Sequence, residues 1–335
     1  MDQISVWKNV DVDTFHNDIV PSGKPAVMRS LFSDWPAVQH ACTSDESICS
    51  YLASADNGTP VYTIAAPPEA RGRFFYSTDL QGVNFRRAQI PLAQVLSQLQ
   101  SAKAGTQSFS LAVQALQVLE TLPQFAVDNP QKLLDDDIAP TMWIGNRGQV
   151  APHYDVHRNL ACVVAGKRQF VLFPPEQVSS LYPGPMLGAP GGVPISMVDV
   201  WDPDLDRFPQ FSAALETALE AVLEPGDAIY IPSLWWHGVA SLEAVNVLVN
   251  YWWDGIGDAQ VSPNDTLMHG LLSIAKLDQT QRRAWRAYFD HYVFREDNDP
   301  TEHLPTNLDD LVTTPNAEQT STVKDFLSEN LKKKP

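Results

Sequence analysis

The spacing of hydrophobic and polar positions changes twice along the chain and predicts three regions. Residues 1–110 give a mixed pattern, with a short helix expected over residues 13–19, strands at PAVMRSLF and TPVYTIAA, and a helix after Pro91. The apolar positions after this proline share one helical face and are Leu92, Val95, Leu96 and Leu99. The pattern therefore predicts a mixed α/β N-terminal region that packs on the rest of the protein.

Residues 111–260 have a different texture, with short β-rich runs separated by turn residues. The runs are TMWIGN, NLACVVAG, QFVLFPP, DAIYIPSLWW and NVLVNYWW. Many short strands without alternating helices favour an antiparallel barrel or a double-sheet jelly roll over a doubly wound α/β sheet. The predicted fold class is therefore mainly β with flanking helices.

Residues 261–335 return to the helical period. Two apolar stripes result, one of Trp285, Tyr288, Phe289, Tyr292 and Val293, the other of Val323, Phe326, Leu327 and Leu331. Helices with such aromatic faces must cover an apolar surface. That surface is either the barrel of the same chain or a second copy of the subunit.

The charge balance narrows the choice of partners. Among 335 residues, 40 are acidic and 23 are basic, so the net charge is −17. This balance argues against a broad basic face for nucleic acid or for an anionic membrane surface. No apolar run approaches the roughly 18 residues of a membrane span, and the N-terminus lacks the pattern of a signal peptide. Cys42, Cys49 and Cys162 form no paired motif, which favours a reducing compartment, and we expect a cytoplasmic protein.

Two histidines and one aspartate make a candidate metal site. His153 and Asp155 stand two residues apart, so in an extended chain their side chains point to the same side. His237 follows the run DAIYIPSLWW, which the turn residues Pro225-Gly226-Asp227 precede, and is expected at the end of that strand. Two imidazoles and one carboxylate form the facial set of non-haem iron oxygenases, which leaves three positions open. In a regular strand His157 would share this face, so it is either a further ligand or part of the pocket wall.

Several polar residues are expected to face an anion. Lys167 and Arg168 follow Gly166 in an apolar strand pair, and strand alternation allows only one of the two to point inward. A cation that points inward needs a counter-charge such as a ligand carboxylate; alternatively, both lie at an exposed turn. Asn159 and Asn250 lie in apolar strands and need partners if buried, either within the sheet or on a ligand.

Taken together, these segments resemble a known family. VAPHYDVHRNLACVVAGKRQFVLFPPEQVSSLYPGP, LEPGDAIYIPSLWWHGVASL and VNVLVNYWW are similar to the cupin-like (cupin 8) branch of the Jumonji C Fe(II)/2-oxoglutarate oxygenases, the branch of the hypoxia-inducible-factor asparaginyl hydroxylases. The resemblance implies a double-stranded β-helix over residues 111–260 that binds Fe(II) through three ligands. These are His153, Asp155 and His237.

The resemblance also implies a cosubstrate site. The distal carboxylate of 2-oxoglutarate would bind Arg168, where relatives commonly have lysine, or Lys167 after a register shift. Further residues expected beside the cosubstrate are Asn159, Asn250 and Trp252. The chain departs from the family pattern at two more places, since Val150 stands where a threonine is common and Ser110 where relatives supply a tyrosine.

The function that the resemblance implies is a hydroxylase that acts on a protein side chain or a small molecule. Fe(II) and 2-oxoglutarate would be required, and succinate and CO₂ released. Two alternatives stay open, a non-catalytic cupin-like binding module and a metal-dependent cupin enzyme that does not use 2-oxoglutarate. Residues 261–335 occupy the place where relatives dimerise, so a homodimer is expected. The acidic charge favours a basic peptide or a small molecule over nucleic acid as the substrate.

Overall fold

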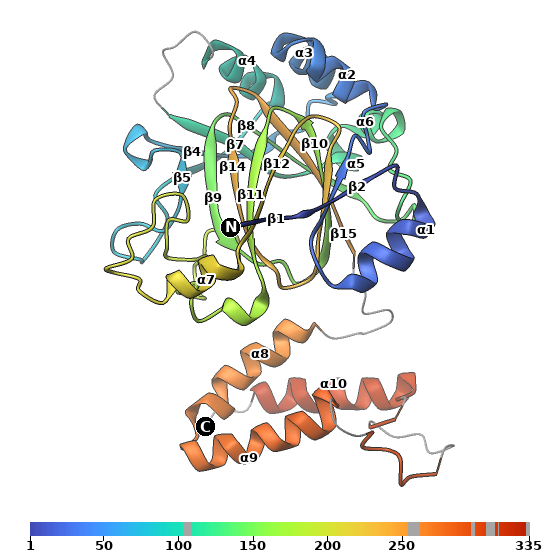
Figure 1. Ribbon diagram of the computed structural model, residues 1–335, viewed down its shortest axis with the longest axis vertical. Helices are drawn as coiled ribbons and strands as arrows, with labels where there is room; N and C mark the ends of the chain where they lie inside the picture. Colours follow the sequence, from blue (N-terminus) through green and yellow to red (C-terminus); the bar gives the residue numbers. More distant parts are fainter. Residues whose placement is uncertain (103–108, 254–261, 296–298, 306–311, 314, 333–335) are drawn as a thin grey trace. The chain divides into compact units, whose positions relative to one another are not determined.

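The computed structural model describes residues 1–102, 109–253, 262–295, 299–305, 312–313 and 315–332 (Figure 1). The chain divides into two compact units, Met1–Gly257 and Asp258–Pro335. The first unit holds the sheets and the second holds helices. The helices of the first unit are α1 (Val12–Thr14), α2 (Pro36–Thr43), α3 (Asp45–Ala55), α4 (Leu92–Ala102), α5 (Val118–Thr121), α6 (Pro123–Asp128) and α7 (Phe211–Thr217).

Two sheets form the first unit. The six-stranded sheet has the order β1 (Asp2–Gln3), β12 (Leu219–Leu223), β11 (Arg168–Phe173), β14 (Trp236–Ser241), β9 (Gly148–His153) and β5 (Arg73–Phe74). The nine-stranded sheet has the order β2 (Ser5–Lys8), β3 (Ala26–Arg29), β13 (Ala228–Ile231), β10 (Arg158–Ala165), β15 (Asn246–Trp253), β8 (Pro140–Gly145), β7 (Ser110–Gln117), β4 (Val61–Ala66) and β6 (Arg86–Ile90). The mainly β fold with a jelly-roll core and flanking helices is confirmed.

The alternation of strand β10 explains how the sheets are covered. Leu160 and Cys162 pack into a core shared with helices α2, α3 and α4, whereas Ala161 and Val163 pack against residues of the other sheet such as Phe170. Both faces of this strand are buried, so its sequence is apolar throughout. The same helical core contains the predicted face of α4. Strands from residues 1–110 extend the nine-stranded sheet at both of its edges.

The second unit consists of helices α8 (Pro263–Leu272), α9 (Gln279–Phe289) and α10 (Ala317–Lys332). Its described helices contain no buried residue. The predicted stripes lie on α9 with the helical turn that follows it and on α10, and most of their aromatic side chains are exposed within this chain, Tyr288 and Phe326 by more than 60%. This unit therefore presents an apolar surface that its own helices do not cover.

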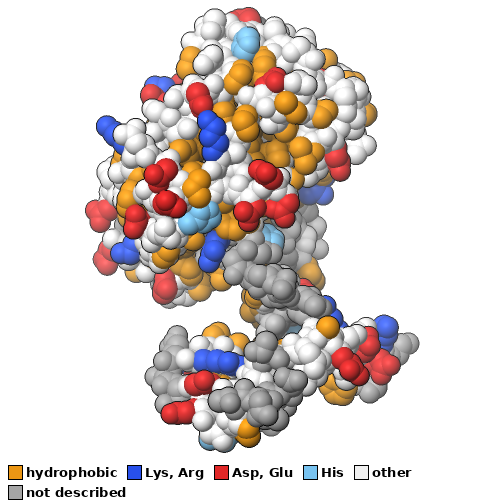
Figure 2. All heavy atoms as spheres, turned by 90° about the vertical axis from the view of Figure 1, so that its right-hand side faces the viewer, with side chains coloured by type: hydrophobic (Ala, Val, Ile, Leu, Met, Phe, Trp, Pro, Cys, Tyr) orange, Lys and Arg blue, Asp and Glu red, His pale blue; other side chains and the backbone are white. Residues whose placement is uncertain are grey.

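The surface of the first unit carries many acidic groups. Figure 2 shows acidic side chains spread over one face of this unit among apolar and neutral residues, with fewer lysine and arginine side chains. Within the described part of the chain, no helix combines the length and the apolar character needed to cross a membrane.

Candidate metal centre and anion pocket

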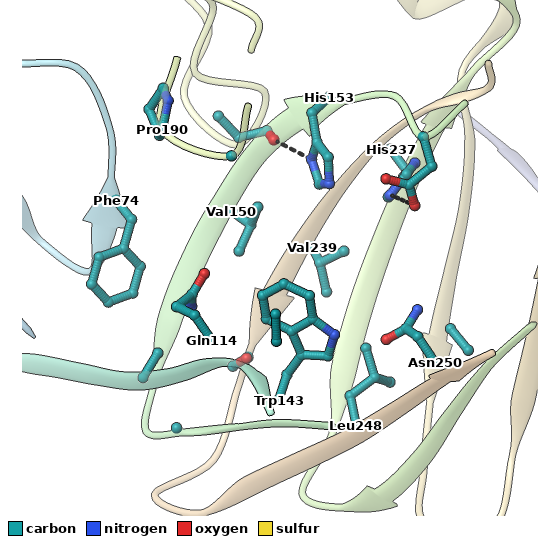
Figure 3. A pocket seen from close by; sticks show the side chains of 18 of the residues that line it. Phe74, Gln114, Trp143, Val150, His153, Pro190, His237, Val239, Leu248 and Asn250 are labelled. Atoms are coloured by element: carbon teal, nitrogen blue, oxygen red, sulfur yellow. Dashed lines mark hydrogen bonds and ion pairs between the residues drawn. The ribbon is translucent and has the colours of Figure 1, made fainter. Parts of the chain in front are cut away.

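A cavity of about 450 Å³ lies between the inner faces of the two sheets. Both sheets contribute to its lining, and Figure 3 shows His153 and His237 near one end with Val150, Val239 and Leu248 beyond them. Most of the wall is apolar, because the inward positions of the strands are the positions that alternation fills with valine, leucine and phenylalanine. Polar groups in this cavity are therefore few and stand out.

The structure brings His153, Asp155 and His237 together. His153 ends strand β9 and lies directly opposite His237 in the antiparallel pair with β14, with ring centroids 4.4 Å apart. Asp155 lies in the turn after β9, and its Oδ2 is 3.7 Å from His237 Nε2. One possible ligand atom from each residue lies within 4.8 Å of the other two. Three potential metal ligands thus converge from two adjacent strands and one turn.

The strand prediction for His237 is wrong in one respect. This residue does not end the strand of DAIYIPSLWW but is the second residue of a new strand, β14, after β13 ends at Ile231. Pro232 has no N–H group to continue the sheet, and Leu234 adopts a left-handed φ of 64° in the turn. The turn brings the imidazole opposite His153.

Backbone contacts determine which nitrogen of each imidazole carries the proton. His153 Nδ1 is 3.1 Å from the carbonyl of Ala151, and His237 Nδ1 is 3.0 Å from the carbonyl of Trp235. A carbonyl only accepts, so each Nδ1 carries the proton and donates it. The Nε2 atom of each ring then has a free lone pair, as metal ligation requires.

The charges of the three groups also suit a metal. Burial, and then the neighbouring His153, lower the pKa of His237 to about 4, so its ring is neutral at pH 7. Burial raises the pKa of Asp155, but His237, His153 and hydrogen bonds outweigh it and hold this pKa below its usual value. A neutral His237 imidazole beside an ionised Asp155 carboxylate fits Fe(II) and similar divalent ions.

Three further predicted residues gather around Asp155. Its Oδ2 accepts hydrogen bonds from Trp252 Nε1 at 2.9 Å and from Asn159 Nδ2 at 3.1 Å. Asn250 Nδ2 in turn donates to Asn159 Oδ1 at 2.7 Å. The sequence allowed two kinds of partner for the buried asparagines, other groups of the sheet or a ligand. In the structure Asn159 bonds to the Asp155 carboxylate and Asn250 bonds to Asn159.

The structure also distinguishes Arg168 from Lys167. Arg168 is 7% exposed and lines the cavity, whereas Lys167 points outward and pairs with Glu224 at 2.7 Å. Within the described residues the Arg168 side chain has no hydrogen-bond or ion-pair partner, and its Nε is buried. Burial lowers the pKa of this guanidinium to about 10, so it remains charged at neutral pH. An unpaired buried cation creates a strong site for an anion.

The remaining predicted positions lie as follows. Val150 faces the cavity and brings no hydroxyl group there, and His157 also lines it from the turn after β9. This turn interrupts strand alternation, so His157 does not join the group of three ligands. Ser110 lines a separate depression, where its hydroxyl lies 3.5 Å from the carbonyl of Arg147.

Sequence reasoning missed two residues of the cavity. Gln114 of β7 faces into it, and Trp143 of β8 packs its ring at 6.2 Å from Trp252, edge to face. A signal for Gln114 exists in the sequence, because it is the polar residue within the otherwise apolar run LAVQAL. No strand was predicted over β7, so the sequence did not indicate that the Gln114 side chain faces the cavity.

Comparison with known proteins agrees with this geometry. Residues 12–259 match the model of the family described as cupin-like domain. The chain is 28% identical to tRNA wybutosine-synthesizing protein 5 of Danio rerio over 270 residues, which cover 75% of each chain. It is 43% identical to lysine-specific demethylase JMJ31 of Arabidopsis thaliana over 101 residues, or 30% of this chain and 18% of the relative. It is 39% identical to lysine-specific demethylase 8 of Danio rerio over 120 residues, or 36% of this chain and 28% of the relative.

The chain thus spans less than a third of either demethylase and three quarters of the wybutosine-synthesizing protein. The family match covers every strand of the two sheets except β1 and β2, together with the three converging ligands and the buried arginine. The protein belongs to the cupin-like domain family, in the JmjC branch of the Fe(II)/2-oxoglutarate oxygenases.

Proposed function

We propose that this protein is an Fe(II)- and 2-oxoglutarate-dependent hydroxylase that acts on a protein side chain or a small molecule. The observation that carries the proposal is the buried, unpaired Arg168 in the same cavity as His153, Asp155 and His237. A metal site alone would suit many cupin enzymes. A cation fixed at the far end of the same cavity favours a ligand with a carboxylate there and a metal-binding group at its other end.

The spacing along the strands supports a dicarboxylate. Arg168 of β11 lies opposite Ser241 of the neighbouring strand β14, and His237 lies four residues before Ser241 on β14. Four residues of strand correspond to about 13 Å between Cα atoms. An arginine side chain that reaches inward, an extended five-carbon diacid and a metal on the histidines together bridge such a separation.

Each residue has a distinct role in this proposal. His153, Asp155 and His237 would hold Fe(II), and Arg168 would bind the distal carboxylate of 2-oxoglutarate through a bidentate pair. When bound, the iron and 2-oxoglutarate supply the chemistry of oxygen activation, with release of succinate and CO₂. The apolar wall, including Val239 and Leu248, would pack against the cosubstrate methylenes and exclude water from the cavity.

Electrostatics support the same ligand. Among the described residues of the lining, Arg168 is the one lysine or arginine and Asp155 is the one aspartate or glutamate. A divalent metal and Arg168 together contribute three positive charges, against one negative charge from Asp155. A dianion therefore neutralises the cavity, although the whole chain carries −17.

The test is succinate formation by the purified protein with Fe(II), 2-oxoglutarate and oxygen, followed by NMR. His153→Ala should lose both Fe(II) binding and turnover, whereas the control His40→Ala, on an outer helix, should keep both. Turnover of His153→Ala at the wild-type rate would contradict the ligand assignment. Binding of metal and 2-oxoglutarate without succinate would indicate a binding module. Metal-dependent turnover that is unaffected by Arg168→Ala would indicate a cupin enzyme that does not use 2-oxoglutarate.

We further propose a homodimer formed through the second unit. The exposed aromatic stripe of α9, with Trp285 and Tyr288, supports this arrangement, because isolated soluble chains rarely leave such a surface uncovered. The three cysteines are free, two of them buried, which supports a reducing compartment such as the cytoplasm.

A further inference from the structure

The cavity extends to both sides of the two histidines. His237 of β14 and His153 of β9 stand on neighbouring strands, and the order of the six-stranded sheet places β11 on one side of this pair and β5 on the other. Arg168 begins β11, whereas Phe74 belongs to β5, and both line the cavity. A cosubstrate that reaches from Arg168 to the metal therefore leaves the β5 side of the cavity for another molecule.

The walls on this side are mostly apolar. We call this part of the cavity the β5 lobe, and the side chains that define it are Ile64, Phe74, Phe85, Gln114 and Val150. The rings of Phe74 and Phe85 meet edge to face with their centroids 5.7 Å apart. Figure 3 shows Phe74, Gln114 and Val150 together, on the side of the cavity away from His237. Val150 faces the cavity and is still 39% exposed, so side chains of the protein do not fill the lobe.

Gln114 gives the lobe a neutral hydrogen-bonding group. It lies on β7, where the register with β8 shifts between Val113 and Leu116 and Ala115 adopts a left-handed φ of 48°. Val113 and Leu116 both pack into the core that helices α2, α3 and α4 share, so this bulge turns the strand over directly after Gln114. Bulges beside ligand sites often direct a side chain in this way. The Gln114 amide is half-buried and bonds to none of the described residues, so it can both donate to and accept from a ligand.

The lobe offers no counter-charge to a cation. Asp155 is the one aspartate or glutamate among the described residues that line the cavity, and it converges with the histidines on the metal position. The metal, Arg168 and Asp155 together balance a dianionic cosubstrate, so a further charge in the cavity has no partner. A lysine or arginine side chain that entered the lobe would lose its hydration without a compensating ion pair.

We propose that the group that enters the β5 lobe beside the metal is neutral and largely apolar, with one amide or hydroxyl that pairs with Gln114, and that the lobe disfavours the cations of lysine and arginine. This inference rests on the proposed function, because it takes the metal and the 2-oxoglutarate site as described there. The acidic surface of the first unit acts on the residues around the reacting group. A basic peptide that presents a neutral side chain agrees with both features.

Two probes of the same shape and different charge test the lobe without turnover. Benzamide is neutral, and benzamidine is cationic at neutral pH. Each is titrated into the full-length protein with saturating Mn(II) and 2-oxoglutarate, and broadening of its ring protons by Mn(II) in NMR spectra measures binding close to the metal. Benzamide should bind at least about tenfold more tightly than benzamidine, because only the cation enters the lobe unpaired.

Substitutions of Gln114 test its part in this preference. Gln114→Glu supplies the missing counter-charge and should reverse the order of the two probes. Gln114→Leu should weaken benzamide by roughly three- to tenfold, the effect of one hydrogen bond, and should not improve benzamidine. The control Gln117→Glu adds the same charge to the same strand at an exposed position, where the native amide donates to the Ala115 carbonyl, and should keep the wild-type order. Where Gln114→Glu does not fold or loses Mn(II), Gln114→Asp takes its place.

The outcomes separate the inference from the proposed function. Benzamidine that binds the wild type as tightly as benzamide, an order that Gln114→Glu leaves unchanged, or a wild type that binds neither probe near the metal overturns the inference, even where 2-oxoglutarate binds and is turned over. A wild type that binds Mn(II) but no 2-oxoglutarate overturns the proposed function, and the preference for benzamide is then measured without the cosubstrate. A wild type that binds no Mn(II) overturns both.

Discussion

Replacement of Arg168 by leucine should change stability and ligand binding in opposite directions. The guanidinium is 7% exposed and has no partner among the described residues, and burial lowers its pKa from its usual value to about 10. A shift of this size corresponds to an unfavourable burial free energy of about 3 kcal/mol. Leucine removes that cost and adds apolar contact with neighbours in the cavity. The free energy of unfolding without ligand should therefore rise by about 1–3 kcal/mol.

The same substitution removes the anion anchor. Loss of one partner of a buried, hydrogen-bonded charge pair costs about 3–5 kcal/mol. Each 1.4 kcal/mol is tenfold in affinity, so 2-oxoglutarate should bind between about a hundredfold and a few thousandfold more weakly. Arg168→Lys keeps the charge and loses the bidentate pair, so it should fall between these limits.

The assays are urea unfolding of the ligand-free protein and calorimetry with Mn(II) and 2-oxoglutarate. Lys167→Leu is the matched control, because this neighbouring cation is exposed and pairs with Glu224 on the surface. It should change stability by less than about 1 kcal/mol and leave 2-oxoglutarate affinity unaltered. An Arg168→Leu variant that is less stable than the wild type and still binds 2-oxoglutarate would refute the reasoning, since Arg168 would then support the fold instead of a ligand.

Three further predictions follow from other parts of the molecule. The metal-free protein should lose stability as the pH falls from about 6.5 toward 4, because burial lowers the pKa of His237 to about 4 and the unfolded chain takes up a proton that the folded chain refuses. Urea unfolding at pH 7 and pH 5 measures this loss, and His237→Gln should reduce it; an equal loss in the variant contradicts the assignment. Light scattering at micromolar concentration should give a dimer for the wild type and a monomer for the double variant Trp285→Ser/Tyr288→Ser, whereas a monomeric wild type excludes the proposed interface. Asp227→Ala should lower the free energy of unfolding by about 3 kcal/mol, because its carboxylate accepts from Arg29 at 2.6 Å and from two backbone N–H groups of a buried turn. Denaturant titration measures this loss, and a change below about 1 kcal/mol would show that the turn does not need the carboxylate.

Periodicity was sufficient to predict about half of the described strands, among them β8, β10, β11, β13 and β15, and the buried face of α4. It also indicated that Arg168 or Lys167 faces inward, but not which one. That choice depends on where β11 begins after the turn at Gly166, whose φ of 74° is set by the packing of the turn against Val245 and Asn246. Local sequence carries little information on such contacts between distant segments.

The candidate ligands show the same limit. The spacing of His153 and Asp155 suggested convergence on one face of a strand, whereas Asp155 lies in a turn and reaches the same space by a different route. Its orientation depends on Trp252, which is 97 residues away in the chain. A contact of this kind follows from the register between strands, and neither propensity nor alternation specifies that register.

The first strands of the chain pair with partners that are synthesised much later. Asp2 lies opposite Leu219, and Ala26 lies opposite Tyr230. Translation proceeds at about 5–20 residues per second, so a nascent chain carries β1 and β3 without these partners for on the order of ten seconds or longer. Pairing across such a distance also slows folding, because a long loop must close before any contact compensates the lost entropy. The N-terminal strands are thus the part of the barrel most exposed to misfolding during synthesis, and their docking completes the two sheets.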